Sequence, residues 1–337
     1  MPLRFNPRRL GDTLLVLSGP LALGTAFAFL APVWWAFDLF SHFRVQYAVA
    51  ALLLAIALLL LRRWAAASLP LVVATANLYF VVPLFIGNGE LSGSNATGTP
   101  ARDPLRVLSV NVFGFNNEHE LALDYVRRER PDVVVVQEVT PAWAEALSKV
   151  APDYRYQWIH AGDLRSGIAV MSRRTPLNVQ QIDLGGTGEP SLLLTLPTDD
   201  GPLSILGTHL YWPLGDRVTA VRNRQLETLA RISRAHATPL VIAGDLNVTP
   251  FSPHFRRLLR EGSLRDCAAG RGVQPTWPAR VPFFFIRIDH CVATQGVRVR
   301  NFRVGDYIGS DHYPIVIDVA VREGATLNPT PDPPGGR

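Results

Sequence analysis

Three long apolar segments with almost no charged positions open the chain, in residues 13–37, 45–61 and 64–86. About 20 apolar residues suffice for a helix to cross the roughly 30 Å hydrocarbon layer of a membrane. Three such segments in succession are not typical of a cleaved signal peptide, whose apolar region has only about 7 to 15 residues. We therefore expect residues 1–87 to form a membrane anchor with three transmembrane helices.

The arginines near these segments are unevenly distributed. They precede the first segment and separate the second from the third, at Arg4, Arg8, Arg9, Arg62 and Arg63. The opposite loop has only Arg44, close to the acidic Asp38. Cytoplasmic loops of membrane proteins are enriched in Lys and Arg, so the N-terminus is expected in the cytoplasm. The expected location is the inner (plasma) membrane, with the residues after about 88 periplasmic or extracellular.

From residue 105 the pattern changes to short β-rich runs that alternate with helical periodicity. DVVVVQEV (132–139) is almost continuously apolar, as in strands buried on both faces. The alternation, with many strands near the end, predicts two packed mixed sheets covered by helices over residues 105–322. Residues 88–104 are rich in Gly, Ser, Thr and Asn and are expected to be a flexible linker, and 323–337 a disordered tail.

Three consecutive phenylalanines and two cysteines allow more than one interpretation. Phe283, Phe284 and Phe285 are expected to lie on a strand that enters the core, with contact to a lipid surface as the alternative. Cys267 and Cys291 are too few for a structural zinc cage. In an oxidising compartment they could form a disulfide, and two buried free thiols are the alternative.

The net charge of the part expected to be exported does not exclude any class of substrate. Residues 101–337 carry 27 basic and 25 acidic residues, a net charge of +2. A nucleic-acid-binding surface would normally show a larger positive balance. The charge therefore favours neither a polyanionic nor a small substrate decisively.

Polar side chains stand where the expected strands end. In LVIAGDLN, alternation of side chains along a strand puts Asp245 and Asn247 on one side and Leu246 on the other. Sites in α/β folds assemble at the carboxyl ends of strands. Other polar residues at the ends or starts of strands are Asn111, Glu138, His209, Asp289, Asp311 and His312. Each alone has a structural explanation as a turn residue, a cap or a buried histidine.

Together these residue types indicate phosphate-ester hydrolysis. Carboxylate and amide oxygens are hard ligands suited to Mg²⁺ or Mn²⁺. A divalent ion neutralises charge on phosphoryl oxygens, a carboxylate aligns the attacking water, and imidazole and amide hydrogens stabilise the transition state. We therefore expect a metal-dependent phosphoesterase with a phosphate-ester substrate.

Eight stretches, in this order, resemble the endonuclease/exonuclease/phosphatase superfamily. They are VLSVNV, VVVVQEV, SGIAVMSR, ILGTHL, RNRQLETL, VIAGDLNVTPFSP, RIDHCVA and GSDHYPIVIDV. The resemblance covers about residues 105–321, and GDLN with SDH in the right order and spacing is its most specific part. It implies a four-layered α/β sandwich and Mg²⁺-dependent (or Mn²⁺-dependent) cleavage of phosphoester bonds.

The resemblance also implies roles for the polar residues. Glu138 resembles the principal metal ligand, with Asn111 beside it and Asp311 nearby. Asp245 resembles the residue that orients or deprotonates the water, and Asn247 its phosphate-contacting partner. The phosphate-facing histidine is His312, held in its tautomer by Asp289, and His209 would donate to a non-bridging oxygen. Gln225 resembles a glutamine that supports the site, with an exposed helix position as the alternative.

One departure bears on the substrate. The abasic-site branch has an acidic residue two positions after the Asn, where this chain has Phe113. Together with His209 in place of a tyrosine, this weakens a DNA-repair function. The leading expectation is a hydrolase of phosphodiesters, of phosphodiesterase or nuclease type, whose substrate the sequence does not identify. Phospholipase, sphingomyelinase-like or phosphatase activity on lipid or small phosphate esters is the alternative. The alternatives to an enzyme are a non-catalytic binding module on the same fold and a structural membrane protein, and no obligate protein partner is evident.

Overall fold

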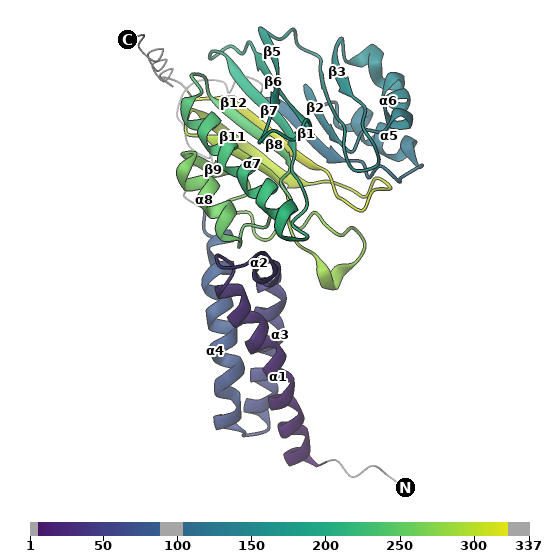
Figure 1. The fold of residues 1–337 in the computed structure, drawn as a ribbon. Helices are drawn as coiled ribbons and strands as arrows, with labels where there is room; N and C mark the ends of the chain where they lie inside the picture. Colours follow the sequence, from purple (N-terminus) through teal and green to yellow (C-terminus); the bar gives the residue numbers. More distant parts are fainter. Residues whose placement is uncertain (1–5, 88–103, 323–337) are drawn as a thin grey trace, which may run out of the picture.

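The computed structural model describes residues 6–87 and 104–322, which form a bundle of helices below an α/β domain (Figure 1). The predicted linker, apart from residue 104, and the predicted tail lie outside the described residues.

Two six-stranded mixed sheets form the centre of the α/β domain. The first has the order β11-β12-β1-β2-β4-β3 and the second the order β5-β6-β7-β8-β10-β9. Strands of the first sheet are β1 (Leu105–Asn111), β2 (Val133–Gln137), β3 (Tyr156–His160), β4 (Ile168–Ser172), β11 (Val297–Val304) and β12 (Ile315–Val321). Strands of the second are β5 (Asn178–Asp183), β6 (Pro190–Leu196), β7 (Leu203–His209), β8 (Leu240–Asp245), β9 (Leu264–Asp266) and β10 (Asp289–Thr294).

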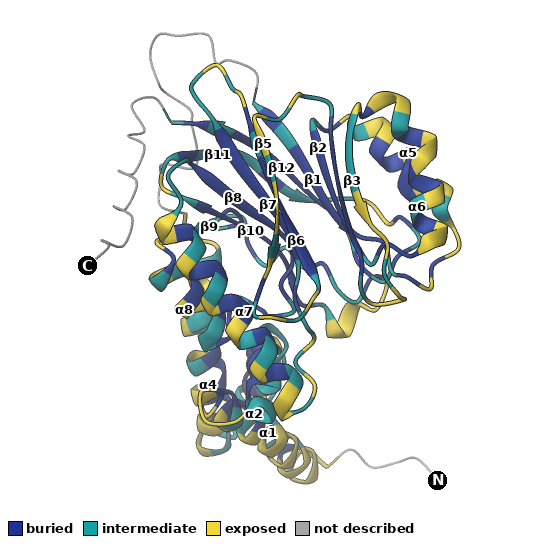
Figure 2. Cartoon of the chain, turned by 45° about the horizontal axis from the view of Figure 1, so that its top comes forward, coloured by how far each residue is buried: buried dark blue, intermediate teal, exposed yellow. Residues whose placement is uncertain are grey.

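Alternating side chains on each strand build three apolar layers. Val133 and Val135 of β2 pack between the sheets, against residues such as Ile205 and Val241 of the second sheet. Val134 and Val136 point the other way, toward α5 (His119–Glu129) and α6 (Pro141–Leu147). On the opposite outer face α7 (Asp216–Ala235) and α8 (Pro253–Glu261) cover the second sheet. Figure 2 shows the buried strands between helices whose outer faces are exposed. The predicted four-layered sandwich is confirmed.

The sequence missed two strands and misplaced one segment. β5 is mostly polar, with Val179 and Ile182 as its two apolar residues, and β9 has only three residues, so neither carries a periodic apolar signal. The strand predicted for the three phenylalanines is wrong: Pro282–Phe284 form a 3₁₀ turn, and Phe283 and Phe284 are 82% and 55% exposed. Their turn precedes β10, so burial begins only at Ile286.

The N-terminal bundle contains α1 (Pro7–Phe29), α2 (Trp35–Ser41), α3 (Arg44–Leu60) and α4 (Trp64–Val81), which continues into the 3₁₀ turn Val82–Leu84. Two of these helices are long and apolar enough to cross a membrane, and α2 with α3, bent by 56°, is a third candidate. Helix α2 was not predicted. Its seven residues span the end of the first apolar segment and the start of the loop that follows, and no separate helix was expected there.

Helix α2 joins the bundle to the α/β domain through buried polar contacts. The carboxylate of Asp38 lies 3.2 Å from the guanidinium of Arg222 on α7 and accepts a hydrogen bond from Ser252. His42 contacts the hydroxyl of Thr249 at 2.9 Å. Asp38 and Arg222 are both almost completely buried. A buried pair of opposite charges requires close partners on both sides, so these contacts fix α2 against the domain.

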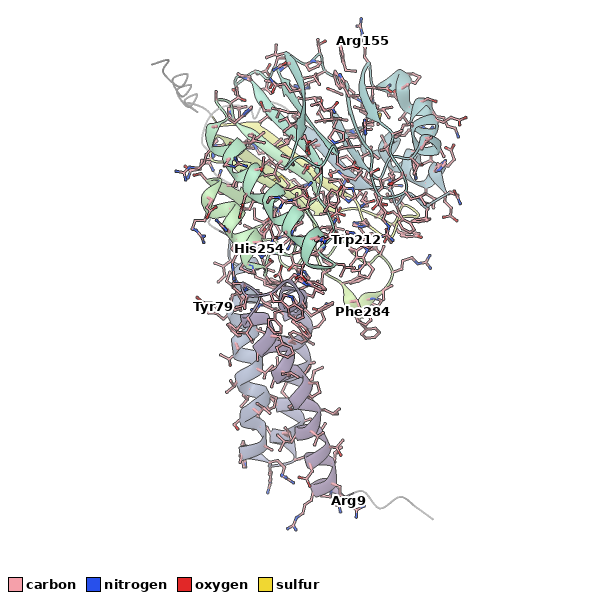
Figure 3. The ribbon with its side chains drawn as sticks, in the orientation of Figure 1. Arg9, Tyr79, Arg155, Trp212, His254 and Phe284 are labelled. Carbon is pink, nitrogen blue, oxygen red and sulfur yellow. A yellow bond between two sulfur atoms is a disulfide. The ribbon has the colours of Figure 1, made fainter. Side chains whose placement is uncertain are left out.

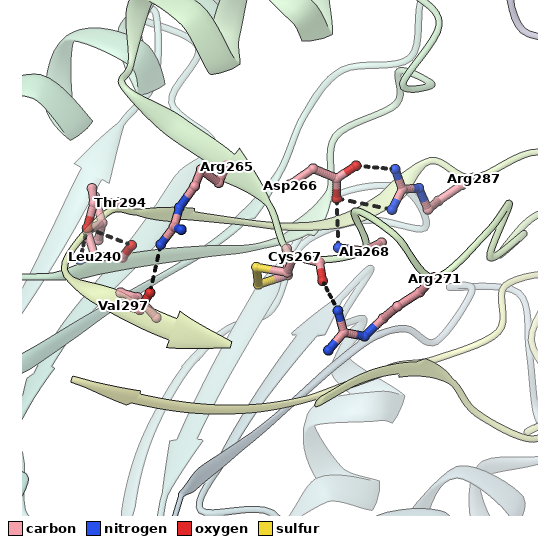
Figure 4. The surroundings of a disulfide bond; sticks show 10 residues. Leu240, Arg265, Asp266, Cys267, Ala268, Arg271, Arg287, Thr294 and Val297 are labelled. Carbon is pink, nitrogen blue, oxygen red and sulfur yellow. Dashed lines mark hydrogen bonds and ion pairs between the residues drawn. A yellow bond between two sulfur atoms is a disulfide. The ribbon is translucent and has the colours of Figure 1, made fainter. Parts of the chain in front are cut away.

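The two cysteines form a disulfide between the end of β9 and β10, with their Cα atoms 5.3 Å apart (Figure 4). Beside it, Asp266 accepts hydrogen bonds from the buried guanidinium of Arg287. Arg287 therefore forms its ion pair with Asp266. Of the two alternatives that the sequence left open, a disulfide or two free thiols, the structure contains the disulfide.

Candidate active site

Strand register brings residues that are far apart in sequence to one edge of the second sheet. His209 at the end of β7 is the partner of Asp245 at the end of the parallel strand β8. Asp289 at the start of β10 pairs with the same Asp245 from the other, antiparallel side. Three of the predicted site residues, His209, Asp245 and Asp289, thus lie in one row on neighbouring strands.

The close approach of β7 and β8 beside His209 and Asp245 requires glycine at position 244. A Cβ atom at Gly244 would lie 1.8 Å from the carbonyl oxygen of Thr208 on β7, and the residue has a φ of +154°. Any other residue would force β7 and β8 apart at the point where His209 and Asp245 meet. In the GDLN motif, packing against β7 therefore explains the glycine, and the chemistry expected of the site explains the aspartate that follows it.

Asn111 links the two sheets at the site. Its amide nitrogen donates to Glu138 at 3.1 Å and to Asp245 at 3.2 Å, so one side chain of the first sheet bridges to the second. The Glu138 carboxylate also accepts a hydrogen bond from the backbone of Gly114 at 2.9 Å. Glu138 has a φ of +60°, a conformation that is uncommon outside glycine. The backbone turns here, immediately after β2, and the carboxylate lines the cavity described below.

His312 and Asp289 form a hydrogen-bonded dyad. Nδ1 of His312 lies 2.8 Å from the Asp289 carboxylate. Burial alone would lower the pKa of His312, but the charge and hydrogen bond of Asp289 outweigh burial and raise the pKa to about 10. Burial would likewise raise the pKa of Asp289, and the opposing effect of His312 keeps it below its usual value. The imidazole is therefore cationic at neutral pH and presents Nε2 to the site.

Asp245 lies between two imidazoles. Nε2 of His209 and Nε2 of His312 are 3.7 and 3.8 Å from the same oxygen of Asp245. These separations are too long for direct hydrogen bonds and leave a position that a water or a phosphoryl oxygen can bridge. Burial, with the charge of Asp289 added, raises the pKa of Asp245 to about 8. Burial lowers the pKa of His209, so that imidazole is neutral at pH 7.

A cavity of about 660 Å³ opens at this edge. Six of the eight predicted site residues line it, namely Glu138, His209, Asp245, Asn247, Asp311 and His312. The other two do not line it but contact three of these six: Asn111 donates to Glu138 and Asp245, and Asp289 is hydrogen-bonded to His312. All eight therefore converge on one place, although their individual roles remain predictions.

Three residues that position the site were missed or left undecided by the sequence. Gln225 is buried and accepts a hydrogen bond from the backbone of Tyr211, which orders the segment after His209. Arg222, on the same helix, donates to the backbone carbonyl of Asn247 at 2.9 Å. Trp277 donates its indole N–H to Asp311 at 3.1 Å. Gln225 and Arg222 lie three residues apart on one helix face, which is the signal that could have identified Arg222.

The donor set fits a divalent cation. Glu138, Asp245, Asp289 and Asp311 meet here, and among the described residues no lysine or arginine forms an ion pair with any of them. Asp245, Asp289 and His312 can each place one ligand atom within 4.8 Å of the others. Nδ1 of His312 is already hydrogen-bonded to Asp289, however, so oxygen ligands around Glu138 suit Mg²⁺ or Mn²⁺ better.

Comparison with known proteins agrees with this geometry. The profile of the Endonuclease/Exonuclease/phosphatase family matches residues 108–312. A humanized D. rerio TDP2 superimposes with a TM-score of 0.54 at 20% identity, covering 64% of this chain and 99% of that chain. An endonuclease/exonuclease/phosphatase from Bacteroides vulgatus gives 0.55 at 17%, covering 66% and 100%. A third, from Beutenbergia cavernae, gives 0.51 at 23%, covering 69% and 74%. No curated protein matches the chain.

Proposed function

Because the chain belongs to the endonuclease/exonuclease/phosphatase family, we propose that it is a divalent-metal-dependent hydrolase of phosphoester bonds. The observation that carries the proposal is the set of eight polar residues around one cavity, with Asp245 between two imidazoles. The catalytic domain comprises residues 105–322, and residues 1–87 are its membrane anchor.

Each polar residue has a role in this reaction. Glu138, Asn111 and Asp311 would hold the Mg²⁺ or Mn²⁺ ion, which neutralises charge on the phosphoryl oxygens. Asp245 orients the water and takes its proton as the water oxygen bonds to phosphorus. The phosphorus–oxygen bond to the leaving alcohol breaks, and the proton passes on to that alcohol. Asn247, His209 and the cationic His312 lie where they can donate hydrogen bonds to phosphoryl oxygens, and Asp289 holds His312 in position.

The distribution of arginines supports a membrane anchor with the catalytic domain outside the cytoplasm. Figure 3 shows Arg9 at the end of the bundle farthest from the α/β domain. Arg63, between α3 and α4, pairs with Asp12 of α1, which places it at the same end. An odd number of spans would put the domain on the side opposite these arginines. By the positive-inside rule the inner (plasma) membrane would then hold α1, α3 and α4, with the domain periplasmic or extracellular.

The comparisons support a phosphate-ester substrate without defining it. D. rerio TDP2, a structural neighbour of 20% identity, has been determined in complex with a single-strand DNA product. Nucleic acid, phospholipid and small phosphate esters are all compatible with the polar residues of the cavity. The proposal needs no protein partner.

Metal dependence is the first test. The full chain in detergent is expected to hydrolyse bis(p-nitrophenyl) phosphate with Mg²⁺ or Mn²⁺, and EDTA should abolish release of p-nitrophenol because Glu138 and Asp311 would lose their cation. Adding excess Mg²⁺ to the EDTA-treated protein should restore the rate. The same comparison of metal and EDTA is then made with a monoester, plasmid DNA and RNA as substrates. Turnover that survives EDTA, or no turnover of any ester with either metal, would count against the proposed function.

A further inference from the structure

The cavity is far larger than a phosphate group needs, and most of its remaining wall is apolar. A volume of about 660 Å³ is typical of sites that enclose a drug-sized molecule. Beyond the polar residues it is lined by apolar side chains that take no part in the hydrolysis described above, among them Leu39, Phe43, Trp212, Leu214, Ile286 and Ile288. These walls leave a region suited to an apolar part of the substrate.

One of these walls belongs to the membrane anchor. Leu39 lies on α2, and Phe43 follows that helix directly. The contacts of Asp38 with Arg222 and of His42 with Thr249 hold this segment against the α/β domain. The substrate site therefore has a polar end in the catalytic domain and an apolar side to which the anchor contributes Leu39 and Phe43.

The apolar surface continues from the cavity toward the bundle. Phe284 is 55% exposed, and its ring lies 6.4 Å from that of Phe43. In Figure 3, Phe284 projects from a loop on the bundle side of the domain, at about the height of Tyr79 near the end of α4. Tyr79 is 76% exposed on a candidate span, as aromatic residues at a membrane surface are. Leu214, 52% exposed, adds to this apolar rim from the catalytic domain.

Charge at the cavity argues against a polyanion. Among the residues that the structure describes, Arg165 is the only arginine or lysine that lines the cavity, whereas Asp163 and Glu189 add to the acidic groups of the site. Proteins that bind single strands use a positively charged groove along the backbone. A substrate with one phosphate group and an apolar portion matches these walls better than a chain of phosphates.

We propose, building on the function proposed above, that the substrate is a lipid phosphoester that enters from the membrane. Its phosphate group lies between His209, Asp245 and His312. Its hydrocarbon portion lies along Leu39 and Phe43 and leaves past Leu214 into the lipid layer. The bonds formed and broken are those of the hydrolysis already described, with water as the second reactant.

A series of p-nitrophenyl alkyl phosphates, with methyl, butyl, octyl and dodecyl chains, tests this proposal on the full chain with Mg²⁺. The leaving group is the same in all four esters, and each is kept below its critical micelle concentration. Only the contact between the alkyl chain and the protein therefore varies. For each buried methylene kcat/KM is expected to rise about threefold to fourfold until the wall is covered. A flat series with measurable turnover of the methyl ester would overturn the lipid proposal and leave the phosphoesterase function intact. No turnover of any ester would overturn both.

Two variants locate the contact. Leu39→Ala/Phe43→Ala is expected to lower kcat/KM for the dodecyl ester about tenfold or more and to change the methyl ester within about twofold. Leu53→Ala, 63% exposed on α3 and outside the cavity lining, is the control. If the double variant does not fold, Leu214→Asn in the catalytic domain should give the same selective loss, with the exposed Leu177→Asn as control. Equal losses on both esters, or faster hydrolysis of single-stranded DNA than of the dodecyl ester, would contradict the proposal.

Discussion

Asp245→Asn is expected to lower kcat for phosphoester hydrolysis by about 10²–10⁴, the range that a positioned general base contributes. Asparagine keeps the size of the side chain and can still accept the hydrogen bond from the backbone of Asn247, but it cannot take a proton from water. Release of p-nitrophenol under saturating substrate measures the effect. Asp124→Asn, on the exposed face of α5, should leave kcat unchanged.

The same substitution should make the metal-free protein more stable. Folding raises the pKa of Asp245 to about 8, above an unfolded value of about 3.9. A carboxyl with a raised folded pKa destabilises the folded state at pH values above the unfolded pKa, and the penalty grows until the pH reaches the folded pKa. In EDTA at pH 7 the variant should therefore unfold at a higher temperature than the wild type, with a difference that shrinks toward pH 4. An inactive variant that is also less stable would instead indicate a disrupted site.

Asp38→Ala is expected to reduce both stability and activity. It leaves Arg222 buried without its anionic partner, and removing one member of a buried ion pair typically costs about 3–5 kcal/mol. Arg222 also donates to the backbone carbonyl of Asn247, so its displacement should move the loop that carries Asn247, which is proposed to contact the phosphate. A shift of about 1 Å at such a position can lower the rate about 10²-fold. Thermal unfolding of the full chain and kcat on a diester measure the two effects.

A double variant separates the two effects. Asp38→Leu/Arg222→Met replaces both charges with apolar groups of similar size and should recover most of the lost stability. It should not recover kcat, because the hydrogen bond from Arg222 to Asn247 is gone. Asp306→Ala, which breaks the exposed pair with Arg128, is expected to change neither quantity noticeably. Full activity in Asp38→Ala would show that the N-terminal bundle does not position the site.

Most of the α/β domain was predictable, because its strands and helices carry strong local patterns. The valines of β2 and the apolar face of α7 are buried as their periodicity indicates. The convergence of the polar residues could be predicted because they stand at strand ends. The strand register explains it: Asp245 of β8 is paired with His209 on one side and with Asp289 on the other. β5, in which Val179 and Ile182 are the two apolar residues and do not alternate with polar ones, has no strand pattern that the sequence could reveal.

The contacts between the N-terminal bundle and the α/β domain could not be predicted from the sequence. Asp38 and Arg44 look like ordinary loop charges between two spans, yet both are buried. Their partners depend on tertiary placement: Arg222 is 184 residues from Asp38, and Asn77 is 33 residues from Arg44. The exposure of Phe283 and Phe284 was missed for a related reason. A short apolar run has the same composition whether it enters a core or faces a lipid surface.

The measurement that tests the central claim most directly is anomalous X-ray diffraction from crystals of the full chain grown with Mn²⁺. If the eight polar residues form one metal-dependent hydrolytic site, a manganese peak should appear within about 2.5 Å of a carboxylate oxygen of Glu138, and Glu138→Gln should remove it. A peak only at another place, or none at saturating Mn²⁺, would contradict the account.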